Sequence, residues 1–215
     1  MKLIILVAAV FLFGFKAQAI GGEEGKIPIK VVVVTMFERG ESVGDKPAEF
    51  QHWVERFPLE EDLAFPLGDR ALRLNREKGV LGVVTGIGTI KAAATIMALG
   101  LDDRFDLSQA YFVIAGIAGI DPADGSLGSA VWTDWVVDGD LLHEIDAREI
   151  PEDWPTGYFP RMRQHPYEGT APKDGRTLVY KLNKGLTSWA YNLTKDEVIP
   201  DTEAMKKFRK RYVNF

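Results

Sequence analysis

Continuous apolar runs, several of them ending in glycine, dominate the pattern of hydrophobic and polar positions along this chain. Residues 27–34, 80–84 and 111–114 are almost uninterrupted apolar stretches. A strand that is apolar on both faces is typical of the interior of a largely parallel sheet, whereas a half-exposed strand alternates. We therefore expect strands at these three places, each buried on both faces.

Helical and hairpin patterns lie between these runs. Residues 47–54 predict a short helix with Pro47 in its first turn, and residues 89–99 predict an alanine-rich helix stopped by Gly100. Residues 70–75 alternate and are expected to pair with residues 79–84 as a hairpin. Strands that alternate with helices indicate an α/β fold with three layers around a central mixed sheet.

The pattern changes after the third apolar run. Residues 130–137 predict a further strand, but residues 138–175 are rich in proline and aromatic side chains and predict a long structured loop. Helical periodicity returns at residues 179–193 and 202–212. The expected organisation is one domain over residues 27–215.

The N-terminus has the composition of an export signal. Lys2 precedes an apolar stretch over residues 3–15, and Ala17 and Ala19 supply small residues at the cleavage positions. The stretch is shorter than the roughly 20 residues needed to cross a bilayer. We expect residues 1–19 to be a cleaved signal peptide, cut near Ala19, and the mature chain to be periplasmic or secreted; an uncleaved membrane anchor is the alternative. No other segment is long and apolar enough to span a membrane.

Composition excludes several function classes. The 215 residues carry a net charge of −5, which argues against a nucleic-acid partner, and the absence of cysteine removes thiolate and disulfide chemistry. The histidines are far apart and lack metal-ligand spacing, so we expect no metal site. The histidines are His52, His143 and His165.

Two turns rich in small residues are the strongest functional signal. Thr85, Gly86 and Gly88 follow one apolar run directly and precede the alanine-rich helix. Backbone N–H groups at such a strand-to-helix turn are unpaired and suit an anion or a ribose hydroxyl. The alternative is that the glycines only make a tight turn.

The second turn follows the next apolar run and contains Ala115, Gly116, Ala118 and Gly119. In open α/β sheets, ligands bind in the crevice at the carboxyl ends of the strands. We expect residues 85–89 and 115–120 to lie side by side at the carboxyl ends of neighbouring strands and to line one such crevice. Neither turn has the spacing of a dinucleotide-binding motif.

Three blocks in this order resemble the nucleoside phosphorylase and nucleosidase superfamily. They are residues 86–94, 115–119 and 128–134. Within that superfamily, residues 35–38, 132–140 and 154–158 are similar to the branch named purine nucleoside permeases. The resemblance extends from about residue 29 to the C-terminus.

The resemblance implies a purine nucleoside as ligand and a nucleoside-phosphorylase-like fold. It assigns the first turn to ribose or phosphate, the second to the base, and the loop after the first strand to the phosphate side. The implied ligand-binding residues are Thr85, Gly86, Gly88, Ala115, Gly116, Ala118, Gly119 and Glu38. No cofactor is implied apart from phosphate as a co-substrate, and the loop at Glu38 departs from the phosphorylase pattern, which leaves phosphate use open.

The resemblance also shows a departure. The superfamily's ribose-binding glutamate and purine-facing aspartate have no counterpart before Phe215, so we expect a C-terminally truncated fold and assign no catalytic residue. One hypothesis is an exported purine-nucleoside-binding protein involved in nucleoside uptake. The alternatives are a nucleoside phosphorylase or ribohydrolase that cleaves the N-glycosidic bond, and a non-functional fragment. The oligomeric state stays open, a homo-oligomer included.

Overall fold

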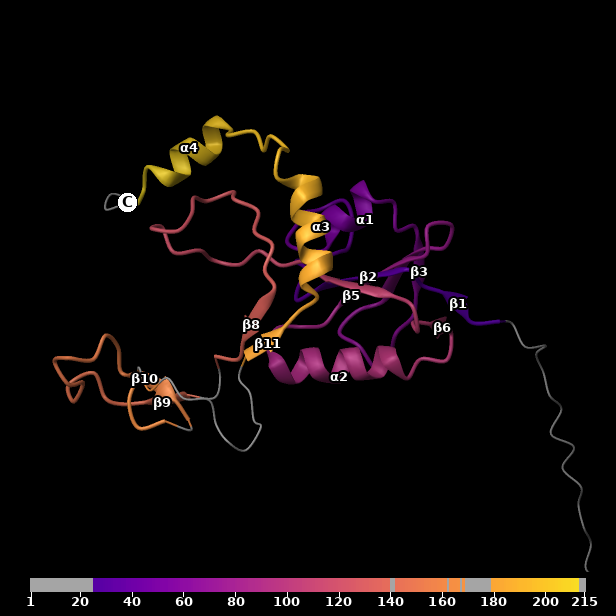
Figure 1. Ribbon diagram of the computed structural model, residues 1–215. Helices are drawn as coiled ribbons and strands as arrows, with labels where there is room; N and C mark the ends of the chain where they lie inside the picture. Colours follow the sequence, from indigo (N-terminus) through magenta and orange to yellow (C-terminus); the bar gives the residue numbers. More distant parts are fainter. Residues whose placement is uncertain (1–24, 140–141, 162, 167, 169–178, 213–215) are drawn as a thin grey trace, which may run out of the picture. The chain divides into compact units, whose positions relative to one another are not determined.

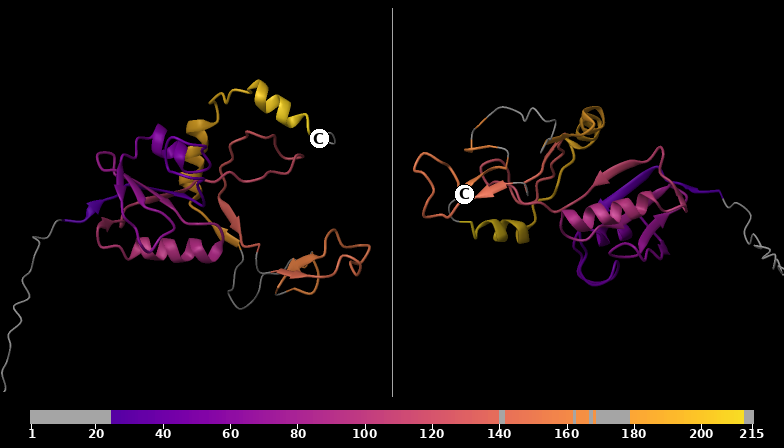
Figure 2. Two further views of the ribbon diagram at one scale, coloured as in Figure 1. Left: turned by 180° about the vertical axis from the view of Figure 1, so that it is seen from behind. Right: turned by 90° about the horizontal axis from the view of Figure 1, so that it is seen from below.

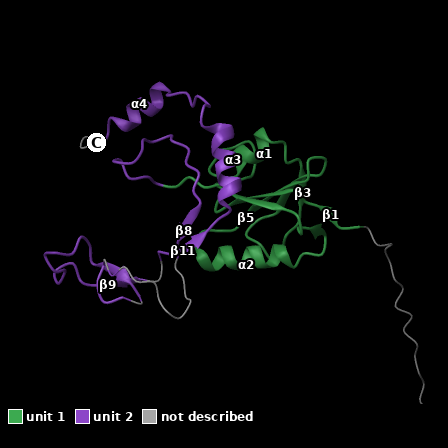
Figure 3. Cartoon of the chain, in the orientation of Figure 1, with its two compact units in different colours: residues 1–118 green, residues 119–215 purple. Residues whose placement is uncertain are grey.

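The structure, a computed structural model, describes residues 25–139, 142–161, 163–166, 168 and 179–212; the predicted signal peptide lies outside them. Contacts divide the chain into two compact units, residues 1–118 and 119–215 (Figure 3). The domain predicted for residues 27–215 covers most of both, and each unit is described by itself.

The first unit is built on a mixed sheet of five strands in the order β3-β4-β5-β2-β7 (Figure 1). β2 runs parallel to β5 and β7, whereas β4 runs antiparallel to β3 and β5. The hairpin predicted for β4 and β5 is therefore confirmed, as is the mixed α/β architecture. The strands are β2 (Val31–Thr35), β3 (Glu61–Leu63), β4 (Leu72–Asn75), β5 (Val80–Val84) and β7 (Tyr111–Ile114).

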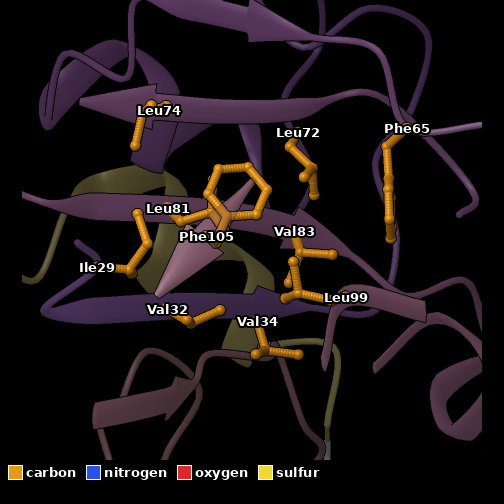
Figure 4. Packing of buried hydrophobic residues seen from close by; sticks show 10 residues of the cluster. All are labelled: Ile29, Val32, Val34, Phe65, Leu72, Leu74, Leu81, Val83, Leu99 and Phe105. Atoms are coloured by element: carbon orange, nitrogen blue, oxygen red, sulfur yellow. The ribbon is translucent and has the colours of Figure 1, made fainter. Parts of the chain in front are cut away.

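One helix packs on each face of this sheet. Val32 and Val34 of β2 pack in one cluster with Leu99 of α2 (Thr89–Gly100), as Figure 4 shows. Val33 packs in a second cluster with Val54 of α1 (Gln51–Arg56). Because neighbouring residues of a strand point to opposite faces, these clusters lie on opposite sides of the sheet. Within this unit the three layers are present, and α2 runs alongside the strands in each view (Figures 1 and 2).

A glycine in β5 leaves room for an aromatic ring. A Cβ added at Gly82 would lie 2.7 Å from Cε2 of Phe50 and 2.9 Å from Cδ1 of Leu59. Both of those side chains are fully buried. The glycine therefore allows the ring to lie against the backbone of a central strand, where any side chain would displace it.

The first predicted strand is in fact two strands. β1 (Ile27–Pro28) pairs in parallel with β6 (Phe105–Asp106), and the chain then changes partner before β2. Pro28 has no N–H to continue a ladder, and the N–H of Lys30 donates to the carbonyl of Gly79 at 2.7 Å.

Two further predictions for this unit are wrong in part. The helix expected from Pro47 begins at Gln51, because the N–H of Gln51 donates to the carboxylate of Glu38 instead of to a carbonyl one turn earlier. β7 forms as predicted but is not buried, since Tyr111 is 57% exposed and Ile114 is 66% exposed. β7 is an edge strand of the sheet, and an apolar sequence alone does not say what covers it.

Among its described residues, the second unit contains two antiparallel strand pairs and two helices. β8 pairs with β11, and β9 pairs with β10. The elements are β8 (Trp135–Val137), β9 (Leu142–Glu144), β10 (Tyr158–Pro160), β11 (Val179–Lys181), α3 (Lys184–Thr194) and α4 (Glu203–Arg209).

Several boundaries here differ from the sequence predictions. The strand expected over residues 130–137 is only its last three residues, and the loop expected over residues 138–175 contains β9 and β10. Residues 179–181 are a strand, not helix; α3 begins after Asn183, whose side chain accepts a hydrogen bond from the N–H of Leu186 at 3.0 Å. Such a cap satisfies an N–H group that the first turn of a helix leaves unpaired.

Candidate functional site

The site predicted from the two turns lies at one edge of the five-stranded sheet. Because β5, β2 and β7 are parallel, their carboxyl ends meet at the same edge. The N–H of Thr85 donates to the carbonyl of Thr35 at 2.9 Å, and the N–H of Ala115 donates to the carbonyl of Val34 at 2.8 Å. Both turns therefore leave the sheet at this edge, although β2 separates β5 from β7, so the expectation that these two strands are neighbours is wrong.

The first turn combines a buried start with an exposed end. Thr85 is 1% exposed, its hydroxyl donates to the carbonyl of Gly86 at 3.0 Å, and its own carbonyl accepts from the hydroxyl of Thr95 at 3.0 Å. Gly86 and Gly88 have φ of +80° and +100°, a region that L-residues with a side chain seldom adopt. The glycines are therefore required by the backbone of this turn.

The start of α2 is open toward solvent. Gly88 is the N-cap and has no side chain with which to bond the first turn. In the described part of the chain, the N–H groups of Ile90 and Lys91 make no hydrogen bond, and both residues are exposed. Such N–H groups are available to a hydroxyl or an anion. Next to them, Nζ of Lys91 lies 3.3 Å from a carboxylate oxygen of Asp69.

The second turn is more exposed than the first. Ala115 is half-buried, whereas Gly116 and Ala118 are exposed. A Cβ at Gly116 would lie 2.5 Å from Cε of Met36, so this glycine allows the turn to approach the end of β2 closely. Gly119, which is exposed, is the first residue of the second unit, whereas the other predicted residues belong to the first.

Glu38, the remaining predicted contact, is 7% exposed and is held by backbone groups. One of its carboxylate oxygens accepts from the N–H groups of Arg39 and Ala48, and the other accepts from Phe50 and Gln51, at 2.5–2.8 Å. Burial raises the pKa of this carboxyl, but the four hydrogen bonds together outweigh burial and hold the pKa below its ordinary value. Glu38 fixes the loop between β2 and α1, and its contact with a ligand stays a prediction.

A second buried carboxylate, which the sequence interpretation missed, joins the two sides of this edge. Oε2 of Glu49 accepts from the N–H groups of Met36 at 2.7 Å and Phe37 at 3.2 Å. Its Oε1 accepts from the N–H of Ile117 at 3.1 Å. The sequence gives no signal of this role, because Glu49 falls in a segment predicted as helix and its partners are 12 to 68 residues away in the chain.

Other kinds of site receive no support from the described residues. Among them, no group of three or more histidine, aspartate or glutamate side chains could hold a metal ion. A cavity of about 730 Å³ follows α4 and includes none of the predicted contacts; it is lined by Glu203, Lys206, Lys207, Arg209, Lys210 and Tyr212. In the part of the chain with described coordinates, no helix has the length and hydropathy of a membrane span.

Comparison with known proteins identifies the family. The family model described as purine nucleoside permease (NUP) matches residues 28–215. The chain therefore belongs to the purine nucleoside permease family, and the resemblance seen in its sequence is confirmed at this level.

Two fungal relatives have the same name. A protein of Schizosaccharomyces pombe called a probable purine nucleoside permease is 35% identical over 146 residues, which cover 64% of this chain and 42% of that protein. The purine nucleoside permease of Candida albicans is 34% identical over 136 residues, which cover 60% of this chain and 33% of that protein. The chain thus spans less than half the length of these relatives. No solved structure matches it.

Proposed function

We propose that this chain is an exported purine-nucleoside-binding protein that takes part in nucleoside uptake. Its membership of the purine nucleoside permease family and the names of its fungal relatives support the ligand class. The export signal predicted at residues 1–19 supports a periplasmic or secreted location.

The observation that carries the proposal is the common edge of β5, β2 and β7. Two turns of small residues leave the sheet there. Beside the first turn, Ile90 and Lys91 are exposed residues whose N–H groups make no hydrogen bond among the described residues. A nucleoside has a flat base and a ribose rich in hydroxyl groups. Small residues let a flat base approach the backbone, and unpaired N–H groups bind ribose oxygens.

On this proposal the ligand contacts keep the assignment made from the sequence. The ribose lies against Gly86 and Gly88, and the base lies against Gly116 and Ala118. The same arrangement of three parallel strands with glycine turns supports a finer fold assignment, in which the first unit is the nucleoside-binding part of a nucleoside-phosphorylase-like fold. Contacts from Thr85 and Ala115 would run through their backbone groups.

Binding of labelled inosine and adenosine to the 215-residue chain, measured by equilibrium dialysis, tests the proposal. We expect saturable binding of both purine nucleosides and much weaker binding of uridine. Free base is measured in the same samples by chromatography, with and without phosphate. Base release would assign cleavage of the N-glycosidic bond in place of simple binding, and no saturable binding of either purine nucleoside would refute the proposal.

A matched pair of glycine variants locates the site. Gly116→Val places a branched side chain at the proposed base side, whereas Gly100→Val places the same side chain at the end of α2, where nothing lies within 4 Å of the added Cβ. We expect Gly116→Val to weaken inosine binding at least about tenfold, the equivalent of roughly 1.4 kcal/mol, and Gly100→Val to leave it unchanged. Equal effects of the two variants would contradict the assigned location.

A further inference from the structure

The carboxylate of Glu49 lies in a small anion-binding seat formed by backbone N–H groups. Three backbone N–H groups, from Met36, Phe37 and Ile117, converge on its carboxylate at 2.7–3.2 Å. The residue is 8% exposed, so water does not replace these bonds readily. Converging backbone N–H groups form an anion-binding concavity, and here the anion belongs to the chain itself.

The seat joins two strands at the proposed ligand edge. Met36 and Phe37 follow β2, and Ile117 lies in the turn after β7. Through these bonds Glu49 fixes where the turn after β7, the proposed base-side turn, lies relative to the end of β2. The turn makes few other fixed contacts, since Gly116, Ile117 and Ala118 are all exposed.

We propose that Glu49 is a positioning residue, whose carboxylate fixes the turn after β7 and fills this seat so that no external anion binds there. The nucleoside half of this inference rests on the proposed function. Its consequence is that the wild type binds neither formate nor inorganic phosphate at this seat, because a second anion there would meet the charge of Glu49.

Removing the carboxylate should turn the filled seat into an open one. In Glu49→Ala the three N–H groups lose their acceptor, and formate is small enough to take its place. Glu49→Gln keeps the seat sterically filled but presents an NH₂ group to N–H donors. Glu60→Ala removes an exposed glutamate of the same unit and serves as the control.

Melting temperature is measured first, in sodium formate, in sodium phosphate and in sodium chloride of equal ionic strength. We expect formate to raise the melting temperature of Glu49→Ala by several degrees, as binding of a ligand to the native state alone does. The wild type, Glu49→Gln and Glu60→Ala should not respond to formate beyond the chloride control. An equal response of wild type and Glu49→Ala would overturn the inference.

Inosine binding gives the second measurement. We expect Glu49→Ala to bind inosine at least about tenfold more weakly, since hydrogen bonds to a charged group are lost, and formate to restore most of the affinity. Formate should leave the affinity of the wild type for inosine unchanged. Unchanged inosine affinity in Glu49→Ala, or no recovery of that affinity with formate, would contradict the inference.

Two outcomes need a separate reading: a Glu49→Ala protein that does not fold, and a wild type that binds no purine nucleoside. If Glu49→Ala does not fold, Glu49→Gln must still weaken inosine binding about tenfold without a formate response, and a Glu49→Gln protein that binds like wild type overturns the inference. If wild type binds no purine nucleoside, the proposed function fails, whereas the melting experiment still decides whether the seat exists.

Discussion

Replacing Glu38 by glutamine tests how the loop between β2 and α1 is held. Each carboxylate oxygen of Glu38 accepts two backbone N–H groups. Glutamine keeps one acceptor oxygen and turns the other position into a donor, so two of the four bonds are lost and two N–H groups face an NH₂ group. The side chain is 7% exposed, which limits compensation by water.

The expected loss is large on the scale of domain stability. A hydrogen bond to a charged group contributes about 1.5–3 kcal/mol, so two bonds correspond to a loss of about 3–6 kcal/mol. A whole domain is stable by about 5–15 kcal/mol. Urea unfolding followed by tryptophan fluorescence measures the free energy of unfolding, with Glu77→Gln, an exposed turn residue, as the control expected to change it by less than about 0.5 kcal/mol.

The stability that Glu38 contributes should fall as the pH is lowered. The pKa of Glu38 is lower in the folded state than its ordinary value of 4.5, so the unfolded chain takes up the proton first as the pH falls. The stabilisation is therefore complete well above pH 4.5 and disappears as the pH falls through the lower folded-state pKa. The difference between wild type and Glu38→Gln should shrink below pH 4.5. A loss under about 1 kcal/mol at pH 7, or a difference that stays constant down to pH 3, would refute the reasoning.

Two further variants test the packing and the caps. Gly82→Ala should lower the free energy of unfolding by about 1–3 kcal/mol, because the added Cβ lies 2.7 Å from the ring of Phe50; a stability equal to wild type in urea unfolding would contradict the packing of β5. Asn183→Ala should lower it by about 1 kcal/mol, since the side chain caps α3 at the N–H of Leu186, and an unchanged helical signal and stability would show that the cap contributes nothing.

The interior of the first unit is predictable from sequence because its signals are local. The run over residues 80–84 is apolar without interruption, and β5 is buried throughout. The alanine-rich pattern and Gly100 place α2 almost to the residue. In each of these cases the residues that specify the element also lie within it.

The missed features depend on partners that are distant in the sequence. The start of α1 is set by Glu38, and the turn after β7 is held by Glu49; neither carboxylate stands in a recognisable pattern. Residues 179–181 look helical by periodicity, but they form β11 because they pair with β8. The wider relation to nucleoside phosphorylases stays a prediction, as do the ligand contacts themselves.

Titration of ¹⁵N-labelled protein with inosine tests the central claim most directly, since it reports on individual backbone N–H groups. We expect saturable shifts of the amide signals of Gly86, Gly88 and Gly116, and none of comparable size with uridine. The signals of α4, which lines the separate cavity, should not move. Shifts confined to α4, or identical shifts with inosine and uridine, would contradict the claim that the carboxyl edge of β5, β2 and β7 binds a purine nucleoside.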